Sequence, residues 1–167
     1  MVQLRKTQEQ DLDFVFELEH QPENSAFVSL WSKEQHAQAL RDADVLHLII
    51  ETQQQQPVGY VILAGLNQSH QNLEFRRLVI GAKGQGFGKA ALKSIKRLAF
   101  EELNAHRLWL DVKDFNTRAQ RLYAAQGFVV EGVLRECLKV GDQFESLVLM
   151  SMLQQEYGQQ IAESNNV

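Results

Sequence analysis

A glycine-rich stretch constrains the fold of this chain more than any other feature. Residues 83–90 read Lys-Gly-Gln-Gly-Phe-Gly-Lys-Ala, between the apolar run Leu78-Val79-Ile80 and a segment with helical spacing, 91–103. Glycine lets the backbone turn sharply and lets a ligand approach the N–H groups closely. The start of a helix adds unpaired donors and the positive end of a dipole. The pattern therefore predicts a strand, a loop and a helix that together bind an anion such as a phosphate group.

Two common phosphate-binding motifs do not fit the spacing of this loop. A Walker A loop needs Gly-x4-Gly-Lys-Ser/Thr, but Lys83 stands at the first glycine and Ala90 at the hydroxyl position. A dinucleotide fingerprint needs Gly-x-Gly-x-x-Gly, and Lys89 stands where its third glycine would be. A glycine-rich connection without a ligand remains an alternative for the loop alone, so its neighbours have to decide.

Length and composition indicate one globular domain. The 167 residues are 44% hydrophobic and 23% charged, which is ordinary for a domain with its own core. The net charge of −4 argues against nucleic acid as the main partner. The N-terminus has no apolar signal core, and no apolar run approaches the roughly 18 residues that span a membrane. We therefore expect no membrane association and a cytoplasmic location.

Cysteine and histidine usage gives no sign of a disulfide or of a metal site. The single cysteine, Cys137, excludes an internal disulfide, which fits a reducing cytoplasm. We expect Cys137 to be buried among apolar side chains rather than to act as a nucleophile. No metal is predicted, because no ligand spacing connects Cys137 with the five histidines, His20, His36, His47, His70 and His106.

Hydrophobic periodicity and turn signals predict a mixed sheet with helices packed on it. Strands are expected at 2–6, 45–51, 58–66, 73–80, 107–112, 128–138 and 144–153. Helices are expected at 8–19, at 33–41 behind a capping box, from the loop to about 103, and at 116–126. The polar segment from 154 is expected to fray. The chain thus reads as a single domain over 1–157 followed by a polar C-terminal tail, 158–167.

The helix that follows the glycine loop is expected to be amphipathic. Its apolar stripe, which includes Ala91 and Ile95, should face the core. Its cations are expected to form a solvated face, with attraction of a phosphate as the alternative; they are Lys89, Lys93, Lys96 and Arg97.

Three segments together resemble the GCN5-related N-acetyltransferases (GNATs). They are Arg77-Leu78-Val79-Ile80 with the loop 83–88, then Leu108-Trp109-Leu110-Asp111-Val112, then Asn116-x-x-Ala119-x-x-Leu122-Tyr123-x-x-x-Gly127-Phe128. The run Glu-Gly-Val-Leu-Arg-Glu at 131–136 resembles the branch with ribosomal-protein N-terminal acetyltransferases and polyamine-acetylating enzymes. The resemblance covers nearly the whole chain in element order. It implies an α/β (α+β) fold with a mostly antiparallel, splayed central sheet of about seven strands, flanked by about four helices.

The resemblance also implies acetyl-CoA as the co-substrate. In this family the loop amides hold the pyrophosphate, and the strand before the loop carries a bulge and splays away from the strand after the helix. The pantetheine arm lies in the resulting gap. Lys83 stands where the family usually has arginine or glutamine, and it keeps the charge but loses bidentate reach. The residues implied to bind the cofactor are Leu78, Val79, Ile80, Lys83, Gly84, Gln85, Gly86, Phe87, Gly88, Lys89, Ala90, Asn116, Ala119 and Tyr123.

The implied reaction is direct transfer of the acetyl group to a primary amine in a ternary complex. Tyr123 matches the tyrosine that donates a proton to the leaving thiolate, and its alternative is a core aromatic. Glu74 is the first candidate for the base, acting through water, with a surface carboxylate as its alternative. Asp111 is the second candidate. Asn116 either contacts the pantetheine or caps the following helix.

The acceptor is expected to be shaped by the first two helices and the last hairpin. Phe27 and Trp31 line an acceptor pocket or close the core, and an acidic rim is a further possibility, with Glu17, Glu19, Glu23 and Asp42. The sequence does not choose between a protein N-terminus, a polyamine, an aminoglycoside or another small amine, nor between a monomer and a homodimer. The alternative function is a non-catalytic acyl-CoA-binding or sensing module. A nucleotide binder unrelated to CoA is disfavoured by the missing Walker hydroxyl.

Overall fold

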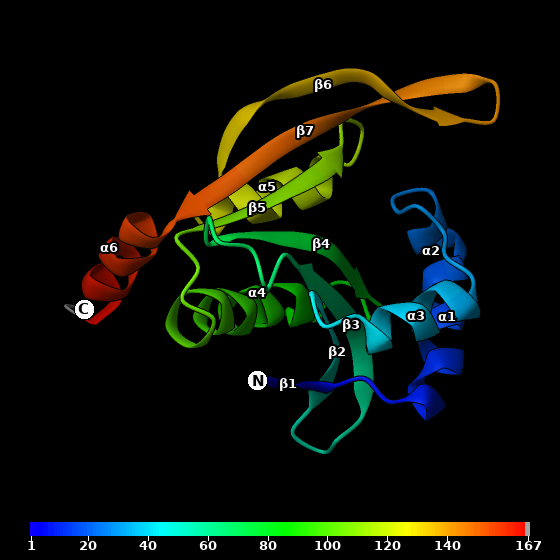
Figure 1. Cartoon of the computed structure of the whole chain (residues 1–167), viewed down its shortest axis with the longest axis horizontal. Helices are drawn as coiled ribbons and strands as arrows, with labels where there is room; N and C mark the ends of the chain where they lie inside the picture. The colour runs from blue at the N-terminus through cyan, green and yellow to red at the C-terminus, as the bar shows by residue number, and fades with distance from the viewer. Residues whose placement is uncertain (166–167) are drawn as a thin grey trace.

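The computed structural model describes residues 1–165 and contains one seven-stranded sheet with the strand order β1-β2-β3-β4-β5-β7-β6 (Figure 1). Neighbouring strands are antiparallel, except that β4 and β5 are parallel. The strands are β1 (Val2–Lys6), β2 (Val45–Thr52), β3 (Pro57–Ala64), β4 (Asn72–Ile80), β5 (Arg107–Lys113), β6 (Val129–Val140) and β7 (Gln143–Leu153). The predicted mixed and mostly antiparallel sheet of seven strands is confirmed.

Six α-helices surround this sheet, where the resemblance implied about four. They are α1 (Leu12–His20), α2 (Pro22–Ser25), α3 (Lys33–Arg41), α4 (Phe87–Arg97), α5 (Thr117–Ala125) and α6 (Gln154–Asn165). The first predicted helix begins as a 3-10 turn, η1 (Glu9–Asp11), and α4 continues into a π-helical segment, η2 (Leu98–Glu102). The predicted capping box of α3 is present, because Ser32 Oγ accepts from Gln35 N and Gln35 Oε1 accepts from Ser32 N.

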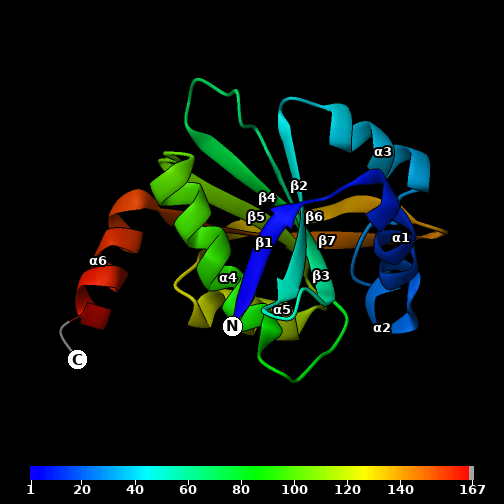
Figure 2. The ribbon, with the colours of Figure 1, turned by 90° about the horizontal axis from the view of Figure 1, so that it is seen from below.

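Two apolar cores lie on opposite faces of the sheet. The larger core joins β2–β5 and β7 to the apolar stripe of α4, including Ala91 and Ile95 as predicted. The smaller core joins Val15 and Leu18 of α1 to β2, β3 and β4. Alternating side chains of one strand feed both cores, since Ile50 belongs to the first and Ile49 to the second. The helices α1–α3 therefore gather on the face of the sheet that α4 does not cover (Figure 2).

The segment from 154 is a helix, so the prediction that it frays is wrong for the described residues. Tyr157 is buried, stacks on Phe100 with ring centroids 4.9 Å apart, and donates from its hydroxyl to Glu101 Oε1. These contacts hold a segment whose own composition is polar. Residues 166 and 167 of the predicted tail lie outside the described residues, and the domain boundary at 157 stays a prediction.

Two further side chains lie where the sequence did not place them. Lys96 is buried rather than solvated, and its Nζ donates to Gln126 O and to Gln160 Oε1, both at 2.9 Å. These two hydrogen bonds compensate for the burial of Lys96.

Cys137 is exposed rather than buried, because it lies on β6, the strand at the edge of the sheet.

The sheet opens between β4 and β5. These strands pair only over Asn72–Glu74 and Arg107–Trp109. The pairing of β3 with β4 shifts between Ile62 and Leu63, which leaves Arg76 as an extra residue in β4. The bulge and the splay implied by the resemblance are confirmed, and they leave a gap between the two halves of the sheet.

Among residues 1–165, no helix is both long enough and apolar enough to cross a membrane. The cytoplasmic location, the absence of a nucleic-acid or membrane partner, and the state of monomer or homodimer stay predictions.

Candidate active site

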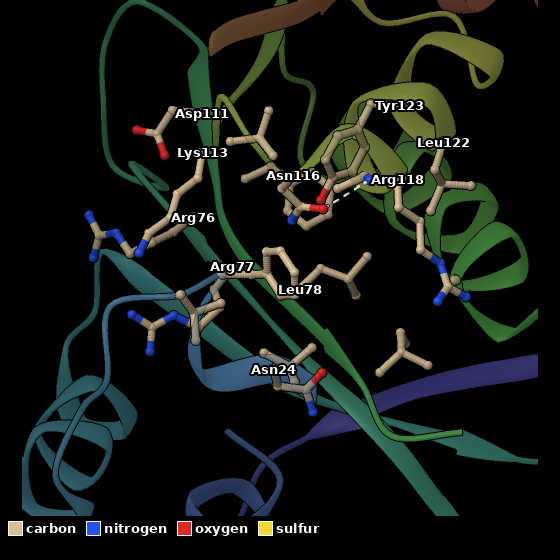
Figure 3. Close-up of a pocket in the computed structure, with 18 of the residues that line it drawn as sticks. Asn24, Arg76, Arg77, Leu78, Asp111, Lys113, Asn116, Arg118, Leu122 and Tyr123 are labelled. Atoms are coloured by element: carbon tan, nitrogen blue, oxygen red, sulfur yellow. Dashed lines mark hydrogen bonds between the residues drawn. The ribbon is translucent and has the colours of Figure 1, made fainter. Parts of the chain in front are cut away.

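A cavity of about 840 Å³ lies in the gap between β4 and β5 (Figure 3). Most of the predicted site residues line it, namely Glu74, Leu78, Val79, Ile80, Lys83, Gly84, Gly86, Phe87, Gly88, Lys89, Asn116, Ala119 and Tyr123. Two of them do not. Gln85 lines a separate cavity beside α1, and Ala90 packs against the larger core.

The glycine loop ends at the first residues of α4. Gly84 and Gly86 have φ angles of +82° and +80°, a left-handed conformation that side chains rarely adopt. Gly86 is the N-cap of α4, and no side chain caps the helix there. Ala90 N donates to Gly86 O at 3.1 Å, so the N–H groups of the three residues before Ala90 are the ones available to an anion.

Cations surround the start of α4. Lys83 comes from the loop, and Lys89 comes from α4 itself. Arg118, which the sequence analysis did not single out, comes from the first turn of α5 and also lines the cavity. Burial and the nearby Arg118 lower the pKa of Lys83. A bound phosphate group would offset this repulsion between like charges, which fits the predicted pyrophosphate position.

Tyr123 packs as a core aromatic side chain and also lines the cavity, and its role as the proton donor stays a prediction. Its ring packs edge-on against Phe75 and Phe128, with centroids 5.9 and 5.8 Å away. Burial, together with the charge of Asp111, raises the pKa of the phenol well above its ordinary value. The hydroxyl therefore keeps its proton at neutral pH and can donate it.

The two candidate bases lie on neighbouring strands. Glu74 pairs in register with Trp109, two residues before Asp111, and both carboxylates line the cavity. Glu74 accepts from the bulge residue Arg76 at 2.7 Å. Desolvation in the cavity wall and the charge of Glu74 raise the pKa of Asp111. Asp111 therefore takes a proton more readily than an ordinary aspartate does.

Asn116 is the N-cap of α5. Its side-chain oxygen accepts from Ala119 N at 3.2 Å, and the residue also lines the cavity. The capping role is confirmed, and the contact with the cofactor stays a prediction.

The prediction that Glu19 belongs to an acidic rim at the surface is wrong. Glu19 is fully buried, and it accepts from Trp31 N at 2.5 Å and from Arg77 Nη1 at 2.6 Å. Its charge is therefore used inside the molecule and does not attract an acceptor at the surface. Phe27 and Trp31 both line the cavity, and Trp31 also packs against the smaller core. Their contact with an acceptor stays a prediction.

Residues 10–128 match the acetyltransferase (GNAT) family. The chain belongs to this family. Transfer of an acetyl group from acetyl-CoA to an amine is therefore its activity. The assignment of the cavity described above as its cofactor cleft stays a prediction. The roles predicted for single residues stay predictions for this GNAT.

Several proteins similar to this chain are polyamine acetyltransferases. This GNAT is 27% identical over 165 residues to spermidine N(1)-acetyltransferase of Vibrio cholerae serotype O1, covering 92% of this chain and 94% of that protein. A crystal structure of spermidine N-acetyltransferase from V. cholerae in complex with CoA and spermine has a TM-score of 0.84 at 25% identity, covering 93% and 97% of the two chains.

Side chains that could ligate a metal do not cluster in the described residues. Within the part of the chain that the structure describes, no three His, Cys, Asp or Glu side chains lie so as to hold a metal ion. The V. cholerae spermidine/spermine N-acetyltransferase has been solved in complex with manganese ions, with a TM-score of 0.80 at 26% identity over 95% of this chain and 96% of that one. The expectation of no metal stays a prediction for this GNAT.

Proposed function

We propose that this GNAT acetylates a primary amine of a polyamine in the cytoplasm. The observation that carries the proposal is the pair of carboxylates, Glu74 and Asp111, in the wall of the cleft. A polyamine carries several positive charges along one flexible chain, which carboxylates attract. Because Glu74 is paired with Arg76, this attraction comes mainly from Asp111. The similarity to spermidine acetyltransferases over nearly the whole chain supports the same acceptor class.

The chemistry begins with the amine, which is protonated at neutral pH because its pKa is near 10. Glu74, the first candidate from the sequence, or Asp111, whose pKa is raised, accepts this proton directly or through water. Acetyl-CoA, when bound, supplies the thioester carbonyl that the neutral amine attacks. Backbone N–H groups of the splayed strand stabilise the negative oxygen that develops. Tyr123 then donates a proton to the departing thiolate sulfur.

The test is an acetyl-CoA consumption assay with spermidine, spermine, putrescine, a peptide with a free N-terminus and an aminoglycoside. We expect kcat/KM for spermidine to exceed that for the peptide by roughly a hundredfold. Spermidine carries two further positive charges that can contact carboxylates, and a neutral peptide carries none. Preference for the peptide or the aminoglycoside would contradict the polyamine assignment. Binding of acetyl-CoA without turnover of any amine would contradict the proposal as a whole.

A further inference from the structure

The segment of residues 22–32, comprising α2 and the loop that leads to α3, is tied across the cleft. We call this segment the strap. Three cations donate to its backbone carbonyl groups: Lys83 Nζ to Glu23 O, Lys113 Nζ to Ala26 O at 3.0 Å, and Arg77 Nη2 to Ser29 O at 2.7 Å. Arg77 lies on β4 and Lys113 on β5. The strap is therefore held from both halves of the splayed sheet.

Arg77, one of these three cations, also forms a buried ion pair with Glu19. The side chain of Arg77 is 6% exposed, that of Glu19 is 0% exposed, and Nη1 lies 2.6 Å from Oε2. The other carboxylate oxygen accepts from Trp31 N at 2.5 Å. The guanidinium carbon also lies 4.3 Å from the centre of the Trp31 ring. One ion pair thus fixes both the backbone and the ring at the end of the strap.

Stability alone is a weak reason for such an arrangement. Taking two charges out of water costs several kcal/mol per ion, and replacing a buried pair with apolar residues is often neutral or stabilising. What an apolar pair cannot do is use one planar group to join an acid, a strap carbonyl and an aromatic face. The contacts of the pair therefore hold the strap in one position.

The strap forms one wall of the cavity, through Phe27, Val28, Ser29 and Trp31. In Figure 3, Asp111 lies on the opposite side of the view from Asn24 of the strap, and Lys113 and Arg77 lie between them. Aromatic faces suit the methylene segments between the charges of a polyamine.

We propose that Glu19 and Arg77 are positioning residues for the amine acceptor, because they fix the strap that carries its aromatic wall. This inference rests on the proposed function. It predicts that loosening the pair weakens acceptor binding and leaves the cofactor end of the cleft unchanged. Lys83 is not used as a test, since it belongs to the predicted cofactor site.

The variant that tests the proposal is Arg77→Lys, which keeps the charge but loses the fork. A matched control is Arg5→Lys on β1, because Arg5 also forks onto a carboxylate, Asp11, at 2.7 and 2.9 Å. We expect Arg77→Lys to raise the KM for spermidine roughly tenfold and to change the Kd of acetyl-CoA by less than about twofold. Hydrogen exchange of the strap amides, including Trp31 N, should become faster. Arg5→Lys should change none of these quantities.

Several outcomes would overturn the positioning role. They are an equal loss of acceptor and cofactor binding, an unchanged KM for spermidine in a folded variant, or unchanged exchange in the strap. If circular dichroism shows that Arg77→Lys is unfolded, Glu19→Gln takes its place, because it keeps the shape but loses the charge. Wild-type protein that neither acetylates spermidine nor binds it beside CoA would instead refute the proposed function, and the inference with it.

Discussion

At the scale of single residues, Tyr123 has a raised pKa because it is buried beside Asp111. The phenol therefore stays protonated at neutral pH, as a proton donor requires, and it is a weaker acid than a free phenol. Its ring meanwhile belongs to the packing between Phe75 and Phe128. Removing the hydroxyl alone separates the two contributions.

We expect Tyr123→Phe to lower kcat by about a hundredfold, because a positioned acid contributes 10²–10⁴-fold. The Kd of acetyl-CoA, measured by calorimetry, should change by less than about twofold. Tyr157→Phe is the matched control, since Tyr157 donates to Glu101 away from the cleft and should leave kcat unchanged. A normal kcat in Tyr123→Phe would remove Tyr123 from the mechanism.

The pH dependence of kcat/KM distinguishes the two candidate bases. A base with a raised pKa loses activity as the pH falls through that pKa, so Asp111 places the acidic limb above the ordinary value for aspartate. Glu74→Gln removes the like charge beside Asp111, and we expect the limb to move to lower pH with most of the activity retained. Collapse of activity in Glu74→Gln, with full activity in Asp111→Asn, would make Glu74 the base.

The residues of the site differ in how far the sequence could reveal them. The glycine loop and Tyr123 belong to local motifs, so their positions follow from spacing. Glu19 resembled a surface acid, because its partner Arg77 is 58 positions away and only the folded sheet brings them together. Arg118 carried a usable signal, a cation two residues after Asn116 in the motif itself.

At the scale of elements, the close approach of β3 to β4 depends on Gly59. A Cβ atom there would clash with Val79 O and would lie 2.9 Å from Ile80 Cδ1. We expect Gly59→Ala to lower the free energy of unfolding by about 2–3 kcal/mol, measured by urea denaturation. Gly132→Ala is the control, because nothing lies within 4 Å of its Cβ position. An equal effect of both substitutions would contradict the steric explanation.

The contact between α3 and β2 makes stability depend on pH. His47 Nε2 lies 3.1 Å from His36 Nδ1, and burial, followed by the charges of His36 and Arg77, lowers the pKa of His47 to about 3. The carboxylates of Glu19 and Asp11 act in the opposite direction. Since the folded pKa is below the unfolded value, this stability is complete above the unfolded pKa of about 6.5 and is lost as the pH falls toward 3.

We expect the urea midpoint of the wild type to fall between about pH 7 and about pH 5. His47→Gln, which can still donate and accept, should show a smaller fall over the same range. A fall of equal size in the variant would assign the acid sensitivity to other groups.

Secondary structure was predictable where it follows from local pattern. The strands follow from runs of β-branched and apolar residues, and α3 follows from its capping box. The helix α6 was missed, because its sequence is polar and its order comes from Tyr157 and Gln160, whose partners lie on α4, η2 and the end of α5. Exposure of Cys137 depends on which strand forms the edge of the sheet, and an alternating pattern does not contain that information.

At the scale of the whole molecule, the predicted domain boundary can be tested by truncation. A chain ending at Tyr157 loses Gln160, one of the two acceptors of buried Lys96, and we expect a loss of about 1 kcal/mol. A chain ending at Leu153 also loses buried Tyr157, and we expect a further loss of about 3 kcal/mol. Urea denaturation measures both. If the two truncations are equally unstable, the boundary at 157 is wrong.

The junction of β4 and β5 has a consequence for the width of the cleft. Strands β4 and β5 pair through only three residue pairs, at one end of the cleft. Elsewhere the two halves of the sheet are connected by side-chain packing and by the strap. The far end of β4, at Ile80, lies six residues beyond Glu74, or roughly 20 Å at about 3.3 Å per residue. A rotation of about 5° about these paired residues would therefore move the far end of β4 by roughly 2 Å. Substitutions at Leu73 or Leu108, which form one of the pairs, can thus change the width of the cleft without touching the ligand.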